Sequence, residues 1–201
     1  MDMNINILLF EEFEPLDVFG PFEVFFNTPG VRNRLFCLDG PQVVCGAGHV
    51  PVSAVGPNEI DHRGILLIPG GDGTRPLSKD RRWLDRLGEL ASEASQVLTV
   101  CTGSALLAAT GLLDGRRATS NDLAFDWVTS VSDRVTWIRD ARWTVDGNFR
   151  TSSGISAGID MALSFIEDMV GPDAADRATT EMEYVRNRDS NFDPFSRSNT
   201  H

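Results

Sequence analysis

The feature that most restricts how this chain can fold is the alternation of short apolar runs with amphipathic helical stretches. The runs at residues 64–69 and 96–100 have the length and composition of buried strands, and a similar run covers residues 4–10. Between the later two runs, the apolar side chains of residues 83–94 fall on one face of a helix. A strand, a helix and a strand in this order predict a βαβ unit, and therefore a mostly parallel sheet.

The same rhythm continues through the C-terminal half. Asp146-Gly147 stands between two short strand-like runs and predicts a hairpin. The pattern as a whole predicts an α/β fold, a three-layer sandwich in which helices cover a mostly parallel sheet. The further expected elements are a helix at 103–110, a turn at 111–115, a short strand at 118–119, a helix at 122–129, hairpin strands at 143–145 and 149–151, a helix through 155–169 and a helix at 173–184.

Length and charge limit the number of domains and the kinds of partner. With 201 residues and 41% apolar content, we expect one domain over residues 1–201, with its core at about 4–185 and a polar tail at 186–201. The 18 basic and 29 acidic residues give a net charge of −11, which disfavours nucleic acid and anionic membranes as partners. The sequence has neither an apolar stretch of the roughly 20 residues that a membrane span needs nor a signal-like N-terminus, so we expect a cytoplasmic protein.

The cysteines and histidines do not follow a metal-binding or disulfide pattern. Cys37, Cys45 and Cys101 are odd in number and widely spaced, and the histidines are scattered along the chain. We therefore expect reduced thiols, no metal and no cofactor.

The strongest chemical signal is Cys101, which ends an apolar run and is followed by the small residues Thr102-Gly103-Ser104 at the start of a helix. This is the outline of a nucleophile elbow, in which a strand-to-helix turn places a nucleophile at the carboxyl edge of the sheet. Because backbone N–H groups at a helix N-terminus favour the thiolate, we predict that Cys101 is ionised near neutral pH. The alternative is that Cys101 is a small buried hydrophobic residue, the commonest fate of a free cysteine.

Two further segments are candidates for the same site. Asp17 follows the first strand among large apolar side chains, and their burial should raise the pKa of its carboxyl and let it donate a proton. The alternative is an ordinary acidic residue at a helix N-terminus beside Pro15. The backbone N–H groups of Gly70-Gly71, in a turn after a strand, are candidates to bind a negatively charged intermediate, although such loops are more often plain turns.

Several motifs occur in the order found in the ThiJ/PfpI superfamily of class I glutamine amidotransferase-like proteins, and the chain resembles its isonitrile hydratase branch most closely. The match extends from about Ile5 to Val170. Several motifs in the right order are more specific than any one alone. They are the Asp17 segment with Gly20-Pro21 and Glu23-Val24-Phe25, the Pro69-Gly70-Gly71 turn, Val100-Cys101-Thr102-Gly103-Ser104, Gly111-Leu112-Leu113-Asp114-Gly115 with Ala118-Thr119-Ser120, and Gly154-Ile155-Ser156-Ala157-Gly158-Ile159-Asp160.

The resemblance implies a flavodoxin-like fold, a homodimer and a nucleophile at Cys101. It assigns the acidic partner to Asp17, a supporting hydroxyl to Thr102, and places in the pocket to Gly154 and Ile155. Protease-like and amidase-like relatives typically have a histidine directly after the nucleophile, where this chain has threonine. The site is therefore better suited to an electrophile that needs a thiolate and a proton donor, such as an isonitrile, than to one that needs a histidine base.

The expected reaction is hydration of an isonitrile to an N-substituted formamide through a covalent thioimidate on Cys101. Relatives usually have His-Trp where this chain has Asn121-Asp122, and this departure leaves the identity of the substrate open. Two alternatives remain: a redox-responsive stress protein that uses Cys101, and a ligand-sensing domain related to transcription regulators. The acidic charge and the polar end of the chain disfavour the second of these.

Overall fold

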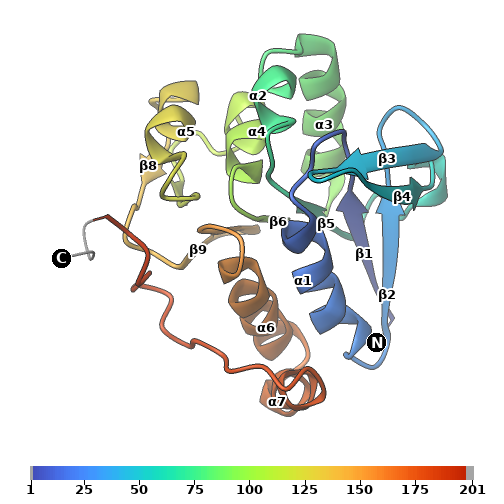
Figure 1. The fold of residues 1–201 in the computed structure, drawn as a ribbon, viewed down its shortest axis with the longest axis vertical. Helices are drawn as coiled ribbons and strands as arrows, with labels where there is room; N and C mark the ends of the chain where they lie inside the picture. The colour runs from blue at the N-terminus through green and yellow to red at the C-terminus, as the bar shows by residue number, and fades with distance from the viewer. Residues whose placement is uncertain (1, 198–201) are drawn as a thin grey trace.

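A mostly parallel sheet of six strands forms the centre of the protein, seen here in a computed structural model that describes residues 2–197 (Figure 1). The strands are β1 (Met3–Leu8), β2 (Val31–Phe36), β5 (Ile65–Ile68), β6 (Gln96–Thr99), β9 (Trp143–Asp146) and β10 (Phe149–Ser152). They lie in the order β2-β1-β5-β6-β10-β9, and all neighbours are parallel except β10 and β9, which form the predicted hairpin.

Helices cover both faces of this sheet, as the ribbon in Figure 1 shows. One layer contains α1 (Pro15–Phe26), α6 (Ala157–Met169) and α7 (Pro172–Glu181), which pack on one another. The other contains α2 (Thr74–Leu77), α3 (Arg81–Glu93), α4 (Gly103–Ala109) and α5 (Phe125–Val131). The predicted flavodoxin-like three-layer sandwich is therefore confirmed.

The register of the parallel strands decides which loops meet. Ile68 at the end of β5 pairs with Thr99 at the end of β6, and Thr99 also pairs with Thr151 of β10. Because the strands are parallel and end at the same level, the loops that follow them converge at one edge of the sheet. These loops begin with Pro69-Gly70, Val100-Cys101 and Ser153-Gly154.

Several elements were not expected from the pattern of apolar residues. The edge strand β2 alternates half-buried with exposed residues and includes two arginines, so it lacks the apolar run of a central strand. Helix α5 begins at Phe125 rather than at residue 122. The other unpredicted elements are the short helix α2, the hairpin β3 (Gln42–Gly46) and β4 (Val50–Ala54), the short 3-10 helix η1 (Pro57–Glu59), and β8 (Thr136–Trp137), which pairs with the predicted β7 (Arg117–Ala118).

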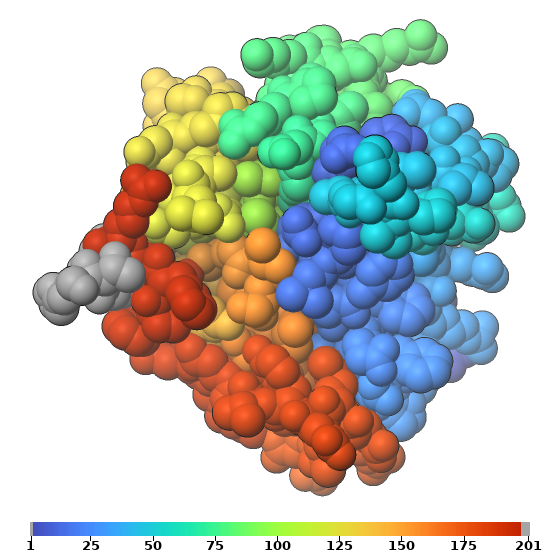
Figure 2. Space-filling view, viewed as in Figure 1, coloured from blue at the N-terminus to red at the C-terminus, as the bar shows by residue number. Residues whose placement is uncertain are grey.

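The C-terminal segment 186–197 packs against the domain, although its composition suggested only a polar tail. Asp193 and Ser196 are buried, and the Asn187 N–H donates to Asp160 at 2.9 Å. Figure 2 shows this segment, in red, lying across the surface formed by α6 and by residues of the yellow region. Buried polar side chains here are stable because hydrogen bonds and ion pairs satisfy them.

Within the described residues, we found no helix that combines the length and the hydropathy of a membrane span.

Candidate active site

Cys101 lies in a strained turn between β6 and α4. Its φ is 56°, in the left-handed region that residues other than glycine seldom adopt. The strain is held by hydrogen bonds on both sides: the Cys101 N–H donates to the Ser153 carbonyl at 3.2 Å, and the hydroxyls of Ser104 and Ser120 donate to the Cys101 carbonyl at 3.1 and 2.8 Å. The predicted elbow is therefore present, with the thiol at the carboxyl edge of the sheet.

Asp17 lies in the first turn of α1, which Pro15 begins, and its side chain is fully buried. Its Oδ2 accepts the Gly70 N–H at 2.9 Å, whereas its Oδ1 is buried with no hydrogen-bond partner among the described residues. Burial raises the pKa of Asp17 to about 8, and the charge of Glu14 adds to the rise; the Gly70 N–H and the Cys101 thiol oppose it. At neutral pH the carboxyl is therefore a protonated acid beside the thiol, as the apolar surroundings in the sequence predicted.

The Gly70-Gly71 turn positions the acid and the hydroxyl of the site. The Gly70 N–H is bonded to Asp17, and the Gly71 N–H donates to Thr102 Oγ1 at 3.0 Å. A Cβ at Gly70 would lie 2.6 Å from Thr102 Oγ1 and 2.9 Å from Asp17 Oδ2, so glycine is required there. The expectation that these N–H groups bind a negatively charged intermediate needs correction, because both already have side-chain acceptors.

The sulfur of Cys101 faces different backbone donors. The N–H groups of Thr102 and Ile155, together with the Thr102 hydroxyl, lower the pKa of the thiol. Burial and the neighbouring Asp17 charge outweigh them, so the pKa of Cys101 lies well above its ordinary value. The prediction of a resting thiolate is therefore wrong: only 7% of the residue is exposed, and the helix N-terminus does not offset the loss of hydration.

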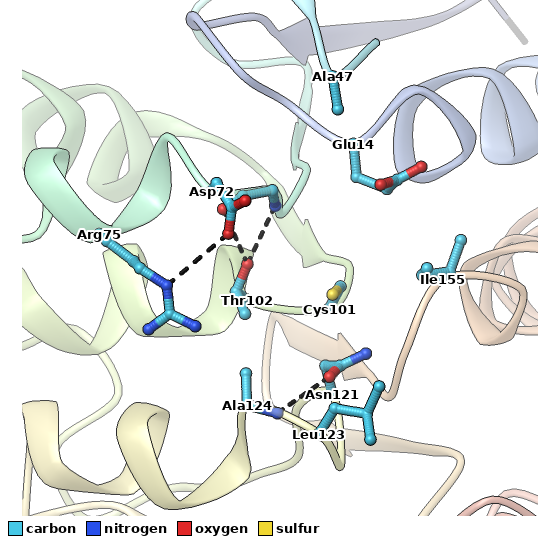
Figure 3. Close-up of a pocket in the computed structure, with 11 residues that line it drawn as sticks. Glu14, Ala47, Asp72, Arg75, Cys101, Thr102, Asn121, Leu123, Ala124 and Ile155 are labelled. Carbon is cyan, nitrogen blue, oxygen red and sulfur yellow. Dashed lines mark hydrogen bonds and ion pairs between the residues drawn. The ribbon is translucent and has the colours of Figure 1, made fainter.

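A cavity of about 250 Å³ opens above the thiol, and Figure 3 shows the residues around it. Cys101, Thr102 and Ile155 line it, as predicted, with Gly71. Gly154 lines an adjoining cavity instead. Lining residues that the sequence did not single out are Glu14, Ala47, Asp72, Arg75, Leu123 and Ala124.

Arg75 has two contacts that fix one wall of this cavity. Its guanidinium lies 3.7 Å from the Asp72 carboxylate and stacks over the ring of Trp127 at 4.5 Å from the centroid. No motif in the sequence pointed to Arg75, because its partners come from a separate helix and a neighbouring turn. This wall therefore carries two charges, and Arg75 and Asp72 pair with each other while the Trp127 ring also contacts the guanidinium.

Asn121 and Asp122, which replace the usual His-Trp, have different surroundings. Asn121 lines the cavity and its Oδ1 accepts the Ala124 N–H at 3.1 Å, which caps the turn before α5. Asp122 is buried and pairs with Arg139 at 2.9 Å. Of these two residues, only Asn121 therefore lines the cavity above Cys101.

Neither His49 nor His62 lines the cavity above Cys101. His62 contacts the Glu93 carboxylate at 3.3 Å and the Pro57 carbonyl at 2.8 Å, and His49 lies in the turn between β3 and β4. His201 lies outside the described residues. Among residues 2–197, no three His, Cys, Asp or Glu side chains gather closely enough to hold a metal ion.

Comparison with known proteins agrees with this fold. The sequence profile of the DJ-1/PfpI family matches residues 3–168, and the chain belongs to this family. Over 190 residues it is 35% identical to the isonitrile hydratase of Pseudomonas putida, covering 92% of this chain and 80% of that protein.

Two solved structures share the fold. A ThiJ/PfpI family protein from Pseudomonas syringae superposes with a TM-score of 0.84 at 25% identity, covering 93% of this chain and 77% of that one. Drosophila melanogaster DJ-1beta gives a TM-score of 0.79 at 18% identity, covering 92% of this chain and 100% of that one.

Proposed function

We propose that this protein hydrates isonitriles to N-substituted formamides. The observation that carries the proposal is a buried carboxylic acid, Asp17, protonated at neutral pH and in contact with the Cys101 thiol beneath an open cavity. The terminal carbon of an isonitrile accepts both a proton and a nucleophile, so it needs an acid and a thiol at one point. The 35% identity to an isonitrile hydratase supports the same reaction.

In the first half of the reaction, the Asp17 carboxyl and the Cys101 thiol both start in their neutral forms. Asp17 gives its proton to the terminal carbon of R–N≡C, which becomes electrophilic. The Cys101 thiol then passes its proton to the Asp17 carboxylate while its sulfur bonds to that carbon. The product is the thioimidate R–N=CH–S–Cys101, and Asp17 is again the acid. A resting thiolate is therefore not needed.

The second half consumes one water molecule. Asp17 protonates the nitrogen of the thioimidate and then accepts a proton from the water that adds to the carbon, which gives R–NH–CH(OH)–S–Cys101. The C–S bond breaks as the hydroxyl loses its proton, and the proton moves to the sulfur. The products are R–NH–CHO and the free thiol. One isonitrile and one water therefore give one formamide, and these steps use no metal or cofactor.

The test is to incubate the protein with an alkyl isocyanide and to measure the formamide by chromatography. We expect Cys101→Ala to abolish turnover and Asp17→Asn to lower kcat/KM about 100-fold or more, because a positioned acid–base group is worth about that much. Activity should fall as the pH rises past about 8, where Asp17 loses its proton. No formamide from the unmodified protein, or equal turnover by Cys101→Ala, would overturn the proposal.

The raised pKa of Cys101 also bears on the redox alternative. Peroxide-sensing cysteines react as thiolates, and burial disfavours the thiolate here. We therefore keep the enzyme as the proposed function, and propose that it acts in the cytoplasm as a homodimer.

A further inference from the structure

A second cavity, of about 350 Å³, adjoins the cavity above Cys101. The two share Asn121, Leu123 and Ile155, so a ligand bound at the thiol can extend from one into the other. Large apolar side chains of the second cavity are exposed to solvent: Leu123 is 83% exposed and Phe195 67%, and Leu16 and Ile155 are exposed as well. Such a cluster beside a reactive group is typical of a ligand site.

The acidic groups of the second cavity are already paired. Asp122 bonds to Arg139 at 2.9 Å, and Asp193 accepts from the Ser153 hydroxyl and from Arg142 at 3.4 Å. The cavity therefore offers an incoming molecule mainly apolar contacts. A charged substituent would lose its hydration there without gaining a matched partner.

The wall on the other side of the thiol has the opposite character. In Figure 3, Asp72 and Arg75 lie on one side of Cys101 and Ile155 lies on the other. An apolar group bound at the thiol is therefore favoured on the Ile155 side, toward the second cavity.

The proposed reaction changes the geometry at the nitrogen that carries the substituent R. The C≡N–R unit of an isonitrile is linear, whereas the carbon and nitrogen of R–N=CH–S–Cys101 are trigonal. The substituent therefore bends away from the line along which the reactant entered. A cavity beside the thiol, rather than in front of it, suits this bent intermediate.

The backbone that carries the aromatic wall of the second cavity is held in place before any ligand binds. The Phe195 N–H donates to Asp193 Oδ1 at 3.2 Å, and the Ser196 hydroxyl donates to Asp140 at 2.7 Å. The Asp193 N–H donates to the Asp140 carbonyl at 2.7 Å. Hydrogen bonds on both sides of Phe195 fix the backbone that carries the ring, so little backbone conformational entropy is lost on binding.

On the basis of the proposed function, we propose that Phe195 is a specificity-determining residue: with Leu16, Leu123 and Ile155 it binds the apolar N-substituent of the isonitrile. The preferred substrates are isonitriles with a ring-sized apolar substituent. Phe195 lines the second cavity and not the cavity above the thiol, so we expect methyl isocyanide to be too short to contact its ring, and isocyanoacetate would place a carboxylate among apolar side chains.

The experiment compares benzyl isocyanide with methyl isocyanide in Phe195→Ala and in the matched control Phe192→Ala, which removes an exposed ring of the same segment outside the cavity. We expect Phe195→Ala to lower kcat/KM for benzyl isocyanide about tenfold, the usual scale for a lost apolar contact. The methyl substrate, and both substrates with Phe192→Ala, should keep the rates of the unmodified protein. Equal losses for the two substrates, or a changed oligomeric state with unchanged selectivity, would overturn the assignment.

A binding measurement separates this inference from the reaction. N-benzylformamide, the expected product, is titrated by calorimetry into Cys101→Ala and into Cys101→Ala with Phe195→Ala. Weaker binding by the double variant supports the subsite even if the unmodified protein turns over no isonitrile, in which case only the proposed reaction fails. Equal binding by the two variants would overturn the subsite.

Discussion

At the scale of single residues, the site depends on how two buried groups share their protons. Asp17 and Cys101 are both desolvated, which raises the pKa of each, and the charge of Asp17 raises the pKa of Cys101 further. The neutral pair is therefore the resting state at pH 7, which is the state that the proposed reaction requires.

The neutral thiol predicts slow alkylation. At pH 7.5 we expect iodoacetamide to modify Cys101 at least about tenfold more slowly than Cys45, because alkylation requires the thiolate and access to solvent. Cys45 is half-buried and serves as the internal control. Peptide mass spectrometry over time gives both rates. Preferential modification of Cys101 at neutral pH would show that the thiolate is populated after all.

The raised pKa of Asp17 predicts how stability depends on pH. Between about pH 4 and 8 the folded state keeps a proton that the unfolded state releases, so the free energy of unfolding falls as the pH rises, by up to ~5 kcal/mol. Asp17→Asn cannot ionise and still accepts the Gly70 N–H. Urea unfolding at pH 5 and pH 8 measures this difference. From pH 5 to pH 8, the free energy of unfolding of the unmodified protein should fall by several kcal/mol more than that of Asp17→Asn. The same pH dependence in both proteins would contradict the buried acid.

At the scale of elements, the start of α4 requires a close backbone approach. A Cβ at Gly103 would lie 2.4 Å from the Ile68 carbonyl oxygen and 2.7 Å from that of Pro69. The strand β5 and the helix α4 would have to separate, and the turn that holds Cys101 would open with them.

We therefore expect Gly103→Ala to lower the free energy of unfolding by roughly 3 kcal/mol. Gly88 in α3 is the matched control, since a Cβ there would meet only the Thr110 side chain at 3.5 Å. Gly88→Ala should be neutral or stabilising by about 0.5–1 kcal/mol, because alanine favours the helix. Urea unfolding measures both. Similar values for the two variants would argue against a steric role of Gly103.

The C-terminal segment is held by a buried ion pair. Arg142 lies 2.7 Å from Asp160 and 3.4 Å from Asp193, and all three are buried. Asp193→Ala should lower the free energy of unfolding by about 2 kcal/mol, less than the loss of an isolated buried partner because Asp160 remains. Asn191→Ala, at an exposed neighbouring position, should change it by less than about 0.5 kcal/mol. Equal stability of the Asp193 variant and the unmodified protein would show that the pair of Arg142 and Asp193 does not stabilise the fold.

At the scale of the whole molecule, the surface of α1 bears on the proposed homodimer. The rings of Phe22 and Phe26 stack at 6.3 Å between centroids, and Phe26 is 67% exposed. We expect sedimentation velocity to show a dimer that Phe26→Asp weakens, because a charge replaces apolar contact area. Phe192→Asp is the control and should leave the dimer intact. A monomeric unmodified protein would refute the proposal.

The sequence alone determined the order of most elements and pointed to Asp17 and Cys101 as parts of one site. Short apolar runs predicted β1, β5 and β6, and the helical periodicity predicted α3 and α6, because burial on one or both faces leaves a local pattern. The strand-to-cysteine-to-glycine motif predicted the turn at Cys101, since the backbone there follows from neighbouring residues. Edge strands such as β2 left no such pattern, because half of their surface stays in water.

Only the tertiary structure decided the charge state and the surroundings of the site. The prediction of a thiolate considered the helix N-terminus, whereas the pKa of Cys101 is set by burial under loops that follow other strands. The N–H groups of Gly70 and Gly71 donate to Asp17 and Thr102, which are far away in sequence. The second cavity joins residues as distant as Leu16 and Phe195. Desolvation and long-range contacts depend on the whole packed chain, so no local pattern of residues encodes them.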